Sequence, residues 1–141
     1  MTRVEFFFNV PDKVAKVVEL CTRAVAKGRK LTIFTHDEHL SANIQDRLWQ
    51  HSATSFLPSA RTGDAEQHDA PIILNQDGER LLQDDILINL KSAHPPFFSR
   101  FNYLVELVGV DEQDKAFARE RFRFYRDRGY QIKSTDASVA E

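Results

Sequence analysis

Short apolar runs alternate with segments of helical periodicity along most of this chain, and this alternation restricts the fold more than any other feature. The runs expected to form strands lie at residues 4–9, 30–35, 71–74, 85–90, 103–108 and 130–133. Helices are expected at residues 12–28, 35–50 and 112–129, with a single helical turn at 95–101. Strands separated by helices are typical of parallel sheets that are covered on both faces. The sequence therefore predicts the α/β class, as a three-layer α/β/α sandwich with a mainly parallel central sheet.

A length of 141 residues is enough for one domain with its own core. Residues 1–133 are predicted to form this single domain, and the small polar residues at 134–141 a flexible tail. Periodicity is lost between residues 51 and 71, so a long loop is expected there. Thr35 and Glu38 have the spacing of a capping box, which predicts the start of the second helix.

The length of the apolar segments also indicates where in the cell the protein is expected to be. No run approaches the ~20 residues that a membrane-spanning helix needs, so no membrane contact is expected. The first ten residues are expected to form a strand rather than a signal peptide. The one cysteine, Cys21, falls among the apolar positions of the first helix, which indicates a buried thiol and no disulfide framework. The cytoplasm is the expected location.

Patterns for catalysis or cofactor binding are weak. The first strand–helix connection, "FFFNVPDKV", has no glycine, although phosphate loops need glycines to bring backbone N–H groups close to the phosphate. We therefore expect a Rossmann-like fold without a glycine-rich phosphate loop. His36 and His39 could contact one metal ion, but no further ligand has a suitable spacing. Asp84 and Asp85 more simply form the polar entry to a strand. No metal, cofactor or catalytic site is expected, and a small nucleotide- or metal-binding α/β enzyme is the alternative.

The last expected helix contains the stretch "KAFARERFRFYRDRG", which has six basic residues and four aromatic residues. At about 100° per residue, Lys115, Arg119 and Arg126 fall on one stripe, with Phe122 inside it and Arg123 on its flank. Phe117 and Phe124 fall on the opposite side, which is expected to be the core face. The stripe is either a solvated face or a receptor for an anionic group and an apolar side chain.

Besides a solvated face and a receptor for an anionic ligand, a third hypothesis is that this helix binds nucleic acid directly. The charge balance of the chain argues against it. The 19 basic residues face 21 acidic ones, which gives a formal net charge of -2. Domains that bind nucleic acid through its phosphates usually have a large positive excess. A short acidic peptide is therefore the better candidate for the basic stripe.

Two aromatic residues in "RLWQHSATSFLP" stand outside the regular apolar pattern. Trp49 is expected at the end of the second helix and Phe56 in the loop after it. They are either anchors of the core or the centre of a protein–protein interface, where such residues are enriched. The interface hypothesis requires Trp49 to be at least partly exposed.

The chain resembles the chi subunit family of bacterial DNA polymerase III, an accessory component of the clamp-loader complex. The resemblance covers nearly the whole chain and rests on four stretches: "VEFFFN", "RLWQHSATSFLP", "DDILINL" and "LVGVDEQDKAFARERFRFYRDRGYQI". It implies a three-layer α/β/α fold and a non-enzymatic adaptor that supports DNA replication.

The resemblance also implies the partners. The family links the replicase to single-stranded-DNA-binding protein by gripping its acidic C-terminal tail, which ends in Pro-Phe, so contact with single-stranded DNA is indirect. The tail site implied for this chain uses Lys115, Arg119, Phe122 and Arg123, with Val108 lining the pocket for the terminal ring and Arg119 on the terminal carboxylate. A second surface, matched by Trp49 and Phe56, is implied to bind the psi subunit or a repair helicase.

Overall fold

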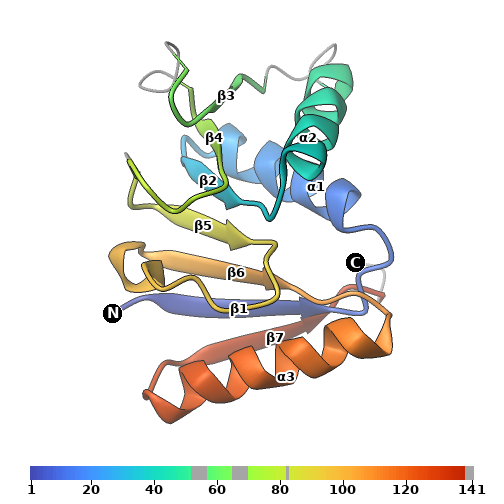
Figure 1. The fold of residues 1–141 in the computed structure, drawn as a ribbon, viewed down its shortest axis with the longest axis vertical. Helices are drawn as coiled ribbons and strands as arrows, with labels where there is room; N and C mark the ends of the chain where they lie inside the picture. The colour runs from blue at the N-terminus through green and yellow to red at the C-terminus, as the bar shows by residue number, and fades with distance from the viewer. Residues whose placement is uncertain (52–56, 65–69, 82, 139–141) are drawn as a thin grey trace.

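The computed structural model describes residues 1–51, 57–64, 70–81 and 83–138, drawn in colour in Figure 1. The elements in chain order are β1 (Arg3–Phe8), α1 (Lys13–Ala26), β2 (Leu31–Phe34), α2 (Glu38–His51), β3 (Ser59–Arg61), β4 (Ile72–Asn75), β5 (Ile86–Asn89), the 3-10 turn η1 (Phe98–Arg100), β6 (Tyr103–Leu107), α3 (Glu112–Asp127) and β7 (Ile132–Asp136).

The strands form one seven-stranded sheet in the order β3-β4-β2-β5-β6-β1-β7. Every strand pair is parallel, including β1 with β6 and β1 with β7. The predicted α/β class is therefore confirmed, and the sheet is more uniformly parallel than expected. Since β1 and β2 are not neighbours, α1 carries the chain over β6 and β5, whereas α3 carries it from β6 over β1 to the edge strand β7.

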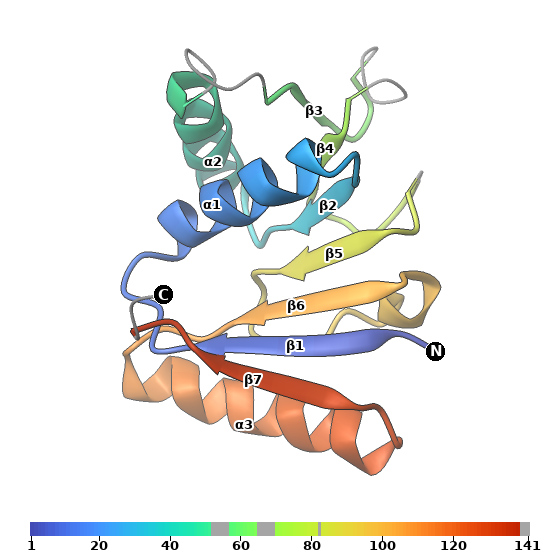
Figure 2. The same cartoon turned by 180° about the vertical axis from the view of Figure 1, so that it is seen from behind.

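Helices cover both faces of the sheet, as the three-layer prediction required. Core residues of α1 and α2, such as Val17 and Ile44, pack with Phe7 and Val105 on one face. On the other face, Tyr125 of α3 packs with residues of the sheet and of η1. Figure 1 shows α3 in front of β7, and the view from behind in Figure 2 brings α1 to the front.

An aspartate caps the N-terminus of each of the three α-helices in the described part of the chain. At α1 the side chain of Asp12 accepts a hydrogen bond from the N–H of Ala15, and at α3 the side chain of Asp111 accepts one from the N–H of Asp114. At α2 the cap is Asp37, whose carboxylate accepts from the N–H of Leu40 at 2.7 Å. The predicted Thr35–Glu38 capping box is therefore wrong, because the Thr35 hydroxyl is instead bonded to that of Ser41 in the core.

Two further parts of the chain differ from the sequence prediction. Strand β3 lies inside the region expected to be a loop, and it was missed because three residues have no periodicity of their own and need β4 as a partner. Strand β7 continues to Asp136, past the expected domain end at residue 133, because it pairs with β1 along its length.

Cys21 is buried as predicted, and burial raises the pKa of its thiol to about 12.

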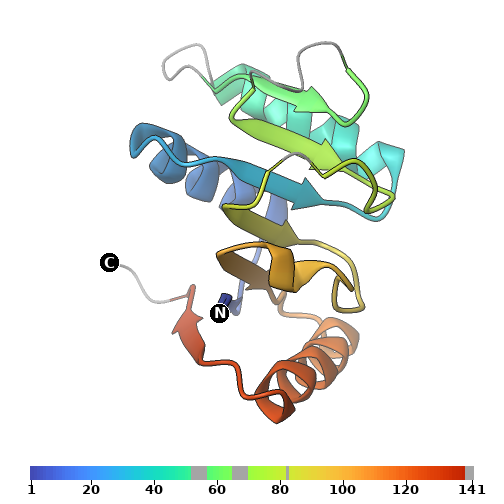
Figure 3. The same ribbon diagram turned by 90° about the vertical axis from the view of Figure 1, so that its left-hand side faces the viewer.

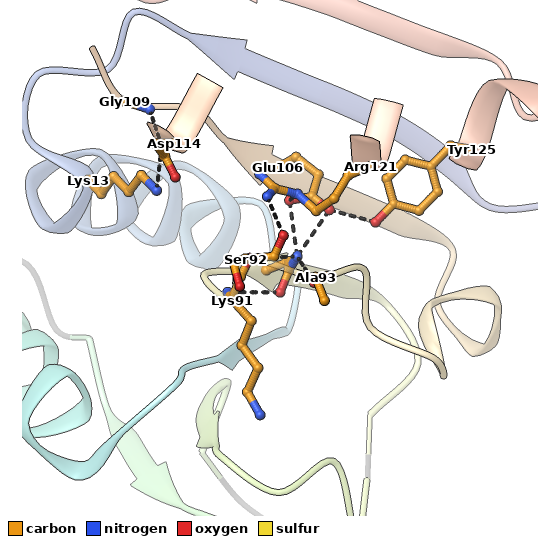
Figure 4. A network of polar contacts seen from close by, with 10 residues as sticks. Lys13, Lys91, Ser92, Ala93, Glu106, Gly109, Asp114, Arg121 and Tyr125 are labelled. Atoms are coloured by element: carbon orange, nitrogen blue, oxygen red, sulfur yellow. Dashed lines mark hydrogen bonds and ion pairs between the residues drawn. The ribbon is translucent and has the colours of Figure 1, made fainter. Parts of the chain in front are cut away.

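A buried carboxylate joins α3 to the sheet. Glu106 of β6 is fully buried and accepts from the Nε of Arg121 at 3.0 Å and from the hydroxyl of Tyr125 at 2.6 Å. The amide of Asn89 donates to the same carboxylate at 3.1 Å, and Arg121 also donates to the carbonyl of Ser92. Figure 4 shows Arg121 and Tyr125 converging on Glu106 between the helix and the sheet. Burial raises the pKa of Glu106, and these donors oppose the shift.

This network corrects the predicted core face of α3. The buried residues of the helix are Ala118, Arg121 and Tyr125, not Phe117 and Phe124. Phe117 is 38% exposed, whereas Phe124 is half-buried and packs against the core at its margin. The prediction assumed that aromatic residues mark the core face, but an arginine lies there because Glu106 requires a charged partner.

Replacing Arg121 by methionine should strongly destabilise the fold. The substitution leaves the Glu106 carboxylate buried without its ion-pair partner, which typically costs about 3–5 kcal/mol. We expect a loss of this size in the free energy of unfolding, measured by urea denaturation at pH 7. Arg126→Met, on the exposed side of the same helix, is the matched control and should change stability by less than about 0.5 kcal/mol. Equal effects of the two substitutions would contradict the role of the network.

Candidate functional site: a cationic groove beside α3

A groove of about 600 Å³ lies between α3 and the edge of the sheet formed by β1 and β7. Its lining comes from the ends of β1 and β6, one side of α3 and the middle of β7: Phe6, Phe8, Asn9, Val108, Lys115, Ala118, Arg119, Phe122, Arg123, Arg126 and Ser134. The structure therefore brings all five residues of the expected tail site into one groove, although Val108 is separated from the others in sequence.

The floor of the groove is apolar. Phe122 is half-buried, and its ring lies 5.4 Å from that of Phe6 between centroids. Val108 is buried at the end of β6, where its N–H donates to the carbonyl of Phe7 and its carbonyl accepts from the N–H of Val10. These backbone bonds fix its position against β1, so an apolar side chain entering the groove would meet a rigid surface.

The wall formed by α3 is cationic. It carries Lys115, Arg119, Arg123 and Arg126, and none of the lining residues in the described part of the chain is acidic. Lys115 lies 3.7 Å from Glu112, and Arg126 lies 3.4 Å from Asp127, so both contacts are long and exposed. Such pairs contribute little and exchange readily for a better partner.

The start of α3 is fixed by a second polar contact, also drawn in Figure 4. Asp114 accepts from the N–H of Gly109 at 2.7 Å and pairs with Lys13 of α1 at 2.9 Å. Partial burial acts to raise the pKa of Asp114, but the bonds from Gly109 and Lys13 outweigh it and hold the pKa below its usual value. The carboxylate therefore stays ionised near neutral pH and anchors the loop that carries Val108 toward the helix.

An apolar floor beside a row of guanidinium groups suits a ligand that combines a ring with a carboxylate. Arginine forks bind carboxylates through two parallel hydrogen bonds, and the ring of such a ligand would be removed from water against Val108 and Phe122. The geometry is less suited to a phosphate cofactor at a helix start, because Asp12, Asp37 and Asp111 already occupy those N–H groups with negative charge.

The second predicted surface is described only in part. Trp49 is 80% exposed at the end of α2, which agrees with the expectation that it is accessible. Phe56 lies outside the described residues. Helix α2, which carries Trp49, and helix α3, which lines the groove, lie at opposite ends of the molecule (Figure 1).

Other features relevant to function can be stated for the described ranges. His36 pairs with the adjacent Asp37, and no cluster of three or more His, Cys, Asp or Glu side chains in these ranges could hold a metal ion. No helix within them is long and apolar enough to cross a membrane.

Comparison with known proteins agrees with the resemblance in the sequence. The family model described as DNA polymerase III chi subunit, HolC, matches residues 1–133. This chain belongs to the DNA polymerase III chi subunit family. The DNA polymerase III subunit chi of Haemophilus influenzae is 31% identical over 140 residues, which cover 95% of this chain and 97% of that protein.

Two further chi proteins are similar over most of their length. That of Pseudomonas aeruginosa is 30% identical over 138 residues, covering 94% of this chain and 95% of the relative. That of Escherichia coli is 28% identical over 119 residues, covering 84% of this chain and 81% of the relative. Membership of the chi family assigns this chain an accessory role in the replicative polymerase.

Sequence reasoning missed several parts of the groove. Phe6, Phe8 and Asn9 come from the first strand, and Ser134 comes from a segment expected to be a flexible tail. No local signal identifies them, because only the placement of β1 and β7 beside α3 brings them to the site. The sequence did indicate Arg126 as a possible residue of the site, since it shares a helical stripe with Lys115 and Arg119.

A small aromatic acid should bind in the groove more tightly than its uncharged amide. We expect N-acetylphenylalanine to cause saturable chemical-shift changes at the backbone amides of Val108 and Phe122, because it supplies both a ring and a carboxylate. The corresponding amide lacks the charge-assisted hydrogen bonds and should bind about tenfold more weakly. Equal binding of the two compounds, or shifts confined to another face, would show that the groove does not recognise a carboxylate.

Proposed function

We propose that this chi-family protein is a non-catalytic adaptor that links the polymerase III clamp loader to single-stranded-DNA-binding protein. It does so by binding the acidic C-terminal tail of that protein. The observation that carries the proposal is the groove beside α3, which combines an apolar floor with four cationic side chains on a chain of net negative charge. A protein with this arrangement contacts single-stranded DNA indirectly, in the cytoplasm, through the protein that coats the DNA.

Each residue of the groove has a distinct role in this proposal. Val108 and Phe122 contact the terminal phenylalanine ring, and Arg119 binds the terminal carboxylate through its planar fork. Lys115 and Arg123 lie on either side of Arg119 along the helix and add to the positive field that attracts an acidic tail.

The exposure of the cationic side chains determines how tightly a tail peptide is expected to bind. Arg119 and Arg123 are exposed, so solvent screens their ion pairs with a peptide. The apolar floor contributes the burial of one ring, and the peptide must lose conformational freedom when it binds. A dissociation constant of about 1 μM is expected for a short tail peptide, and it should rise with salt because the Debye length shortens to ~3 Å at 1 M.

Arg119→Ala should abolish most of the affinity for a tail peptide that ends in Pro-Phe. Loss of charge-assisted hydrogen bonds to the carboxylate should weaken binding by about ten- to hundredfold, measured by isothermal titration calorimetry. Arg128→Ala is the matched control, because the Arg128 guanidinium lies over the ring of Phe124 and does not line the groove. Arg119→Lys should recover only part of the affinity, since lysine keeps the charge without the fork.

Two outcomes would contradict the proposal. Unchanged binding by Arg119→Ala would remove Arg119 from the site. Tight binding of bare single-stranded DNA at ~0.15 M salt, in the absence of its coating protein, would favour the direct nucleic-acid hypothesis instead.

The second partner is proposed to bind at Trp49. A tryptophan that is 80% exposed at a helix end is typical of a protein–protein hot spot, and Phe56 is proposed to join it. The psi subunit or a repair helicase is the proposed partner.

Trp49→Ala should weaken binding to one of these two partners while tail binding stays unchanged. Truncation of a hot-spot tryptophan typically costs 2 kcal/mol or more, so a roughly thirtyfold loss is expected in pull-down titrations with purified psi subunit and purified helicase. Gln50→Ala, at the neighbouring exposed position of the same helix, is the control. Unchanged affinity for both proteins would exclude Trp49 from the interface.

A further inference from the structure

Strand β7 is the last strand of the sheet, and among the described residues no strand pairs with its outer edge. The N–H of Val4 donates to the carbonyl of Gln131, and the N–H of Ala137 donates to the carbonyl of Phe8. Hydrogen bonds to a neighbouring parallel strand use alternate residues, so odd-numbered residues of β7 direct their backbone groups to β1. The N–H and C=O groups of Ile132, Ser134 and Asp136 therefore point away from the sheet.

This free edge borders the groove beside α3. Ser134 lines the groove and directs its backbone N–H and C=O groups away from the sheet, and it lies opposite Phe6 in the sheet register. Phe6 in turn forms part of the apolar floor with Phe122. Figure 3 shows β7 and α3 as the two elements at the lower end of the molecule. A peptide in the groove would therefore lie within reach of unpaired backbone groups.

The cations on α3 extend along this edge. Arg126 follows Arg119 by seven residues, which is about 10.5 Å along a helix at 1.5 Å per residue. An extended chain advances about 3.3 Å per residue, so it covers this span in about three residues. A tail whose carboxylate lies at Arg119 would thus place acidic side chains near Arg123 and Arg126 while its backbone passes Ser134.

The direction of the chain follows from the same geometry. Helix α3 leads from the end of β6 back to the start of β7, so it runs opposite to the parallel strands. A peptide that approaches Arg119 from the side of Arg126 runs against α3 and therefore along β7 in the parallel sense. The edge is also unprotected, because β7 contains no proline and its one lysine, Lys133, is directed toward Glu5 on the other face.

We propose that the acidic segment before the terminal residues of the tail binds as an eighth strand, parallel to β7, with its carboxylates facing Arg123 and Arg126. This inference rests on the proposed tail binding and adds how the tail is held. Charge complementarity favours an acidic segment as the occupant, and addition of a strand to an exposed edge is an established mode of peptide binding. The sheet would then supply sequence-independent contacts, whereas α3 would supply selectivity for negative charge.

N-methylated tail peptides test the strand directly. Because only alternate residues of a paired strand face their neighbour, N-methylation should weaken binding with a period of two along the segment. We expect losses of about five- to tenfold at the positions that face β7 and less than twofold at the positions between, measured by fluorescence anisotropy. Equal effects at neighbouring positions, or none, would overturn the eighth strand.

A pair of variants at one position tests the protein side. Ser134→Pro removes the outward N–H without removing a hydrogen bond to β1, and proline is tolerated at such edge positions. Ser134→Ala keeps that N–H and removes only the hydroxyl. We expect Ser134→Pro to bind the tail peptide about fivefold more weakly than Ser134→Ala, with equal thermal unfolding midpoints for the two variants.

The outcomes separate this inference from the proposed function. If the unmodified peptide does not bind the parent protein, the proposed tail site is wrong, and the proposal of an eighth strand is then wrong as well. If the parent binds the peptide, Arg119→Ala weakens it, and both the methylation series and the Ser134 pair show no difference, the tail site stands and the eighth strand is wrong. If Ser134→Pro unfolds at a lower temperature, the methylated peptides alone decide.

Discussion

The ion pair between Glu106 and Arg121 is the interaction on which the groove depends. A carboxylate inside a sheet is costly unless it is paired and hydrogen-bonded, and Glu106 obtains partners from Arg121, Tyr125 and Asn89. Two of these partners lie on α3, so satisfying Glu106 fixes the rotation of the helix about its axis. With Arg121 turned inward, the stripe that carries Arg119 faces the space beside β1 and β7.

Arginine thus has two separate uses on one helix. Arg121 is buried and structural, whereas Arg119, Arg123 and Arg126 line an open groove. The positive field of the groove is local, because the chain as a whole has a formal charge of -2. At physiological salt the field of exposed charges extends about 8 Å, which suits a short acidic peptide better than the long backbone of a nucleic acid.

The position of the groove distinguishes this protein from nucleotide-binding members of the same fold class. Doubly wound sheets usually bind ligands beyond the carboxyl ends of their strands, where helix N-termini offer N–H groups. In this chain aspartates take those N–H groups, as Asp12 and Asp37 show. The groove lies instead between a helix and the free edge of the sheet, a place that offers guanidinium groups, an apolar floor and unpaired backbone.

The sequence by itself determined the α/β class, the helix that carries the cations, the burial of Cys21 and the resemblance to the chi family. These follow from local periodicity and from residues that lie close together in the chain. Only the tertiary structure decided that Arg121 lies inside, that β7 extends to Asp136 and that Phe6 and Ser134 join the groove. Each of these depends on a partner at least 15 residues away or on the order of strands, as in the pairing of Phe6 with Ser134. The energy of a buried charge or an edge strand is set by such a partner, and local sequence does not encode where that partner lies.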